Sequence, residues 1–178
     1  MTPAEKAGSG DSVTTRSGGA PGGHSPLREG EESAVSLRIP CAPEYVGTAR
    51  LTILGVAGRM GFTYDQVEDI RLAVGEACTN AIDRASRNGS HSTDNFINIL
   101  CHVEAAKLTI EVEDHTGKGA AASDADIEAP AGDIEGMNPQ ELGALLMEIL
   151  VDEVNMEALP DGGGTRVRLV KYTAEAAQ

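Results

Sequence analysis

The longest helical pattern in the chain covers residues 63–89, TYDQVEDIRLAVGEACTNAIDRASRNG, and this stretch decides the fold. Thr63 and Gln66 form a capping-box signal at its start, and Asn88-Gly89 ends it. Its apolar positions recur every three or four residues, at Val67, Ile70, Val74, Cys78, Ala81 and Ala85. This is the spacing of one buried helix face, so we expect a long helix packed against the rest of the domain.

Shorter patterns lie on both sides of this helix. Alternating apolar residues predict a strand over 34–40, and three- and four-residue spacing predicts a helix over 43–57. Alternation at 97–103 and 108–112 predicts a β-hairpin, residues 138–150 a capped helix, and residues 167–172 a last strand. The order strand, helix, helix, strand, strand, helix, strand predicts an α+β fold with the helices on one face of a mostly antiparallel sheet.

The chain also divides by composition. Residues 1–33 hold seven Gly and three Pro, with Val13 and Leu27 as their only large aliphatic residues, so they predict a disordered tail. The folded domain is expected over 34–173, followed by a short C-terminal tail at 174–178. Residues 120–137 are small and acidic with no hydrophobic period, which indicates a mobile connection.

The formal charge is −14, from 28 acidic against 14 basic residues, and it is spread unevenly. Residues 103–178 hold 16 acidic and 5 basic residues, a net charge of −11, and no Lys or Arg occurs between Gly119 and Gly164. Such a surface repels phosphate backbones, so direct binding to nucleic acid is not expected. No apolar run approaches the length of a membrane span, and three widely spaced cysteines suggest buried, reduced thiols. We therefore expect a cytoplasmic protein.

Three places could carry chemistry. Glu76 and Asn80 lie four residues apart and so share one helix face. That face is either a solvated polar surface or a site in which a carboxylate takes a proton and a carboxamide oxygen holds a divalent cation. Asp114, at a strand end before Gly117 and Gly119, belongs to an ordinary turn or to a second part of such a site. Gly143, near a helix start, is a candidate for contact with phosphate.

Three longer stretches carry a family resemblance: IPCAPEYVGTARLT at 39–52, GRMGFTYD at 58–65 and RLAVGEACTNA at 71–81. They resemble the bacterial anti-sigma factor and serine-protein kinase RsbW, and the resemblance continues to about residue 172. RsbW-like proteins belong to the GHKL ATPase group. The resemblance therefore implies a two-layer α/β sandwich of the Bergerat type, with a pocket for ATP between sheet and helices.

The resemblance assigns roles to the pair on the long helix. Glu76 would be the general base toward a substrate serine. Asn80 would hold Mg²⁺ against the phosphates of ATP. Both roles suit phosphoryl transfer, which depends on charge neutralisation and on an oriented nucleophile.

The resemblance also implies residues that bind the nucleotide. Asp114 would accept a hydrogen bond from the adenine amino group, and Thr165 would lie near the adenine. Gly117 and Gly119 would let the backbone approach the nucleotide. Gly143 would match part of the phosphate-binding box.

Partners follow from the same resemblance. Family members bind an alternative sigma factor or phosphorylate a serine on a STAS-type anti-anti-sigma protein, and the bound nucleotide determines which partner they hold. They are usually homodimers. An acidic face would suit a basic surface of a sigma factor.

The chain departs from the family pattern at both nucleotide boxes. One extra residue separates Asp114 from Gly117, Glu141 replaces a glycine of the phosphate box, and Ala144 replaces a leucine. Glu141 either caps its own helix or opposes the triphosphate. The nearest base to the predicted connection is Lys118.

Three functions therefore stay open. The first is an anti-sigma factor with ATP-dependent serine kinase activity. The second is a sigma-binding protein with weak nucleotide binding and no kinase activity. The third is a switch kinase that acts on a scaffold STAS protein.

Overall fold

The computed structural model describes residues 33–87, 95–115, 136–160 and 163–174. The two predicted tails lie outside these ranges except for their inner residues, Ser33 and Ala174. Of the predicted connection at 120–137, only Gly136 and Met137 are described. The domain boundaries at 34 and 173 therefore stay predictions.

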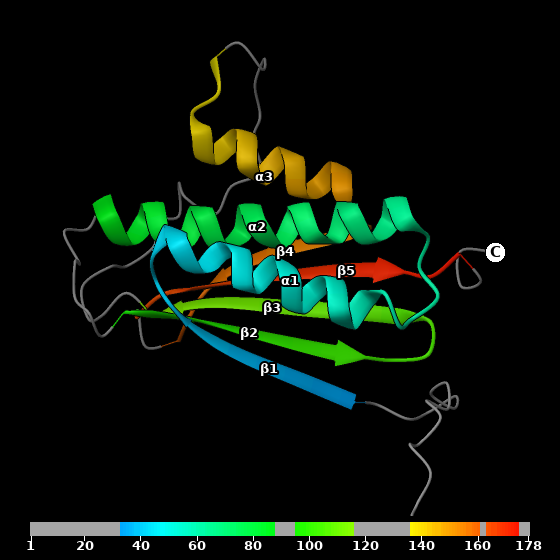
Figure 1. Ribbon diagram of the computed structural model, residues 1–178. Coiled ribbons are helices and arrows are strands. Elements are labelled where there is room, and N and C mark those ends of the chain that lie inside the picture. The colour runs from blue at the N-terminus through cyan, green and yellow to red at the C-terminus, as the bar shows by residue number, and fades with distance from the viewer. Residues whose placement is uncertain (1–32, 88–94, 116–135, 161–162, 175–178) are drawn as a thin grey trace, which may run out of the picture.

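One sheet of five strands forms the base of the described part, and three α-helices cover one of its faces (Figure 1). The strand order is β1-β2-β3-β5-β4, and all neighbouring strands pair antiparallel. This arrangement confirms the predicted α+β class. The elements are β1 Ser33–Pro40, the 3-10 helix η1 Pro43–Tyr45, α1 Val46–Ala57, α2 Tyr64–Arg87, β2 Phe96–Val103, β3 Lys107–His115, α3 Pro139–Leu150, β4 Glu153–Ala158 and β5 Thr165–Tyr172.

Strand β4 was not among the expected elements, and the predicted order was wrong there. It is short and pairs only with β5, at the edge of the sheet. Glu153 and Glu157 are exposed, while Val154 and Met156 are only half-buried against the core. Charged residues are typical of edge strands because they oppose pairing with other chains. They also weaken the alternating hydrophobic pattern by which a strand is predicted from sequence.

Helix α2 lies in the middle of the helical layer and packs against both α1 and α3. Its capping box is formed: the Thr63 N–H donates to Oε1 of Gln66 at 3.0 Å, and the Gln66 N–H donates to Oγ1 of Thr63 at 3.3 Å. Its apolar face, including Ile70 and Val74, is fully buried over the sheet. Because α2 and α3 run in opposite directions, the start of α3 lies beside the later half of α2 (Figure 1).

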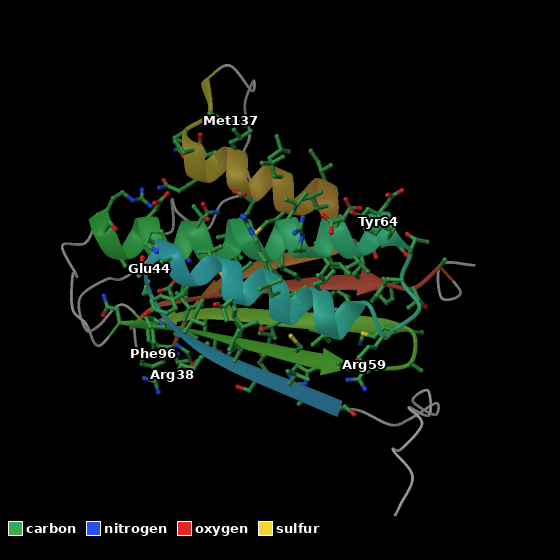
Figure 2. The ribbon with its side chains drawn as sticks, viewed as in Figure 1. Arg38, Glu44, Arg59, Tyr64, Phe96 and Met137 are labelled. Atoms are coloured by element: carbon green, nitrogen blue, oxygen red, sulfur yellow. The ribbon has the colours of Figure 1, made fainter. Side chains whose placement is uncertain are left out.

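The opposite face of the sheet carries polar residues. There the guanidinium of Arg38 lies 3.3 Å from the centre of the Phe96 ring, and Figure 2 shows the two side chains together at one end of the sheet. A shallow hollow of about 260 Å³ next to them is lined by Ser36, Arg38, Asn98, Leu100, Glu111 and Glu113. No helix in the described ranges has the length and apolar character needed to cross a membrane.

All three cysteines are free thiols. Cys78 and Cys101 are buried, and burial raises the pKa of Cys78 to about 12 and that of Cys101 to about 11. Cys41 is only half-buried, so the expectation of a buried thiol was wrong for this residue. It follows β1, and its N–H donates to the carbonyl of Asn95 at 3.1 Å.

Candidate functional site

Glu76 and Asn80 lie one turn apart on α2. Asn80 is 4% exposed, whereas Glu76 is half-buried. A solvated polar face is therefore the wrong description of Asn80. Burying a carboxamide costs free energy unless its polar atoms find partners inside the protein. A buried asparagine is therefore a strong candidate for binding a ligand.

Asn80 faces the start of α3. A Cβ atom added to Gly143 would lie 2.9 Å from Nδ2 of Asn80 and 3.1 Å from its Oδ1. Because Gly143 has no side chain, the carboxamide can occupy this place between the two helices. The structure thus brings together the proposed metal ligand and the proposed phosphate-box glycine.

Helix α3 begins with a capping box. The Asn138 side chain accepts hydrogen bonds from the N–H groups of Gln140 and Glu141, both at 3.0 Å. Oε2 of Glu141 in turn accepts from the Asn138 N–H at 2.7 Å. The capping interpretation of Glu141 is therefore confirmed, since its carboxylate is used at the end of its own helix.

Asp114 lies near the end of β3 and is 1% exposed. Its Oδ1 accepts a hydrogen bond from the N–H of Thr165, the first residue of β5, at 3.3 Å. A Cβ atom on Gly164 would lie 1.8 Å from the Asp114 carbonyl oxygen, so the chain passes Asp114 too closely for any side chain at this position. The two residues assigned to the adenine, Asp114 and Thr165, are thus in direct contact.

Arg84 is a residue of this site that the sequence reasoning missed. Its Nη2 donates to Oδ2 of Asp114 at 2.7 Å, and its Nε donates to the same oxygen at 3.2 Å. Both side chains are buried. The sequence feature that could have identified Arg84 is its position four residues after Asn80, which places both residues on the same side of α2.

Successive turns of α2 therefore carry Glu76, Asn80 and Arg84, a spacing of roughly 6 Å from each to the next along the helix axis. Glu76 provides a half-buried carboxylate, Asn80 a buried carboxamide, and Arg84 binds the carboxylate of Asp114. The predicted site residues Gly117 and Gly119 lie outside the described residues.

This fold and this arrangement match a known class of protein. The sequence model of the histidine kinase-like ATPase domain matches residues 39–171. The chain belongs to this family.

Within the class, several curated relatives are serine-protein kinases. The chain is 35% identical over 141 residues to the serine-protein kinase RsbW of Bacillus subtilis (strain 168), which covers 78% of this chain and 84% of that protein. It is 32% identical over 150 residues to the serine-protein kinase RsbW of Staphylococcus aureus, over 81% of this chain and 89% of that protein. The resemblance to RsbW is thus confirmed.

A solved structure has the same fold. It is the crystal structure of the RsbU and RsbW domains of Rv1364c from Mycobacterium tuberculosis, with a TM-score of 0.51 and 17% sequence identity. The match covers 78% of this chain and 32% of that chain. At this identity the match supports the two-layer fold alone.

Proposed function

We propose that this chain is an ATP-dependent serine-protein kinase and anti-sigma factor of the RsbW type. The observation that carries the proposal is the buried Asn80, held against Gly143 on a helix that also places Glu76 and reaches Asp114 through Arg84. The RsbW relatives support this function, because they are about one third identical to this chain over most of both sequences.

The residues fit ATP and Mg²⁺. Asp114, whose Oδ1 accepts from the Thr165 N–H, would also accept from the adenine amino group, and the absence of a side chain at Gly143 leaves room for the Asn80 carboxamide between α2 and α3. The Asn80 oxygen would be one ligand for Mg²⁺, which commonly takes its other ligands from phosphates and water. Bound ATP would supply the phosphoryl group, and Mg²⁺ would neutralise the charge of the phosphates during transfer.

Glu76 acts on the protein substrate. Its carboxylate would accept the proton of the serine hydroxyl as that oxygen attacks the terminal phosphoryl group of ATP and ADP leaves. Its half-buried position, one turn from Asn80, suits a base that must meet both a nucleotide and a protein partner.

The partners follow from the family. The chain holds an alternative sigma factor or phosphorylates a STAS-type anti-anti-sigma protein, as a homodimer in the cytoplasm, through the domain at 34–173. The capping role of Glu141 weakens one argument for a protein with weak nucleotide binding, because its carboxylate accepts a hydrogen bond at 2.7 Å from the Asn138 N–H at the start of its own helix.

Phosphate transfer from labelled ATP to the STAS partner, in the presence of Mg²⁺, tests the proposal. Wild-type protein should label the partner and Asn80→Ala should not. Asn98→Ala is the matched control, since Asn98 lines the hollow on the opposite face of the sheet. Calorimetric titration with Mg-ATP separates the kinase from the binding-only alternative, which predicts that nucleotide binding is weak. A scaffold STAS protein labelled in place of the anti-anti-sigma protein would favour the switch-kinase alternative.

A further inference from the structure

The carboxylate of Asp114 is held from two sides. On Oδ2 it accepts both hydrogen bonds from Arg84, and on Oδ1 it accepts one from the Thr165 N–H. A carboxylate offers about four acceptor positions, so these three bonds leave one on Oδ1 for a ligand. The guanidinium thus fixes both the orientation of the carboxylate and the oxygen that remains available.

We propose that Arg84 sets the purine preference of the site by keeping Asp114 a pure hydrogen-bond acceptor. This inference rests on the proposed function, in which Asp114 meets the base of the nucleotide. An ionised carboxylate accepts from the 6-amino group of adenine but repels the 6-oxo group of hypoxanthine or guanine. Arg84 is a positioning residue, since it acts on the base through Asp114.

The physical reason lies in the burial of the pair. A carboxylate that is buried without a cation favours its neutral, protonated form. A protonated carboxyl group can donate as well as accept, and it would then tolerate a 6-oxo purine. The Arg84 guanidinium, which forms an ion pair with Asp114 at 2.7 Å, supplies the cation that a buried carboxylate needs.

Among the described residues, few other titratable groups lie near Asp114. From the segment after β1, Cys41 approaches the pair: burial first, and then the charge of Asp114, raises the pKa of its thiol, while Arg84 lowers it. From β5, Asp114 receives only a backbone N–H. Its neighbours on β3 are engaged elsewhere, Glu113 with Arg166 and His115 with Phe96. Within the described residues, Arg84 is therefore the cation that faces this carboxylate.

The test compares the affinities for ATP and ITP by calorimetry, at mildly acidic and mildly alkaline pH, without a protein partner. ITP carries the 6-oxo group on the same ribose triphosphate, so protonation of the phosphates cancels in the ratio. We expect wild-type protein to prefer ATP at both pH values. In Arg84→Gln, which can still donate a hydrogen bond but has no charge, the preference should fall about tenfold or more at the acidic pH.

Arg84→Lys is the matched variant that keeps the charge, and it should keep a preference that does not depend on pH. A purely structural role of Arg84 predicts lower thermal stability in both variants with the wild-type ratio of affinities, and this result would overturn the inference. Tighter ATP binding by Arg84→Gln would overturn it as well, because Arg84 would then compete with the base.

Two outcomes need only wild-type protein, so the inference can be tested even if Arg84→Gln fails to fold. A wild-type preference that declines at acidic pH contradicts the role of Arg84 and leaves the proposed function intact. Wild-type protein that binds neither nucleotide contradicts both.

Discussion

The carboxamide of Asn80 occupies the space beside Gly143, where an added Cβ atom would lie 2.9 Å from Nδ2 and 3.1 Å from Oδ1. This contact joins α2 to the start of α3 and fixes where the buried amide lies. A contact this close requires the neighbour to shift when a methyl group is added. The position of Asn80 therefore depends on the absence of a side chain at residue 143.

Gly143→Ala should weaken ATP binding about tenfold or more, because the new methyl group displaces the Asn80 carboxamide. The fold should survive, since alanine favours a helix over glycine by about 1 kcal/mol and offsets part of the strain. Calorimetry with Mg-ATP measures the loss. Gly55→Ala on α1 is the control, because its Cβ meets no atom within 4 Å and should leave ATP affinity unchanged. Equal affinities in both variants would show that the contact has no part in binding.

Gly164, unlike Gly143, is expected to affect the stability of the fold. Gly164→Ala would place a Cβ atom 1.8 Å from the carbonyl oxygen of Asp114, and should lower the free energy of unfolding by about 3 kcal/mol or more. Urea denaturation measures the change. The neighbouring Gly163→Ala meets nothing within 4 Å and should stay within about 0.5 kcal/mol of wild type. Similar stabilities for the two variants would contradict the close approach of the chain to Asp114.

Two substitutions of Glu141 distinguish a role in helix capping from an effect on nucleotide binding. Glu141→Ala removes the acceptor of the Asn138 N–H and should lower the free energy of unfolding by about 1 kcal/mol. Glu141→Gln keeps an acceptor there and removes the charge, so it should preserve stability and ATP affinity. If Glu141→Gln bound ATP about tenfold more tightly than wild type, the carboxylate would oppose the triphosphate after all.

The three thiols should differ in reactivity. Burial raises the pKa of Cys78 to about 12 and that of Cys101 to about 11, so few of these groups are thiolates at mildly alkaline pH. Cys41, whose pKa is also raised, is half-buried and should react first in the native protein. Mass spectrometry after timed alkylation gives the order, and denatured protein, in which all three react, is the control. Early labelling of Cys78 would contradict the packing of α2.

The sequence predicted those elements whose signals are local. The apolar period of α2 and its capping box at Thr63 and Gln66 lie within one helix, and both were found. Glu76 and Asn80 were proposed as site residues from their spacing of four and from the resemblance, and their roles stay predictions. The start of α3 was equally local, since Asn138 and Glu141 are three residues apart.

The sequence did not predict features that depend on distant partners. Arg84 and Asp114 lie 30 residues apart and meet only because α2 packs over the end of β3. No side chain fits at Gly164 because the pairing of β5 with β3 brings the chain close to Asp114. Strand β4 was missed because a short charged strand at a sheet edge depends on its partner for order.

The proposed kinase reaction uses Glu76 as its base and holds the nucleotide through Asn80 and Asp114. Its most direct test is phosphate transfer from labelled Mg-ATP to the STAS partner in a single turnover, with wild-type protein and Glu76→Gln, alongside calorimetry with Mg-ATP. We predict that Glu76→Gln binds ATP like wild type but transfers phosphate at least about a hundredfold more slowly. Transfer at the wild-type rate by Glu76→Gln would contradict the account.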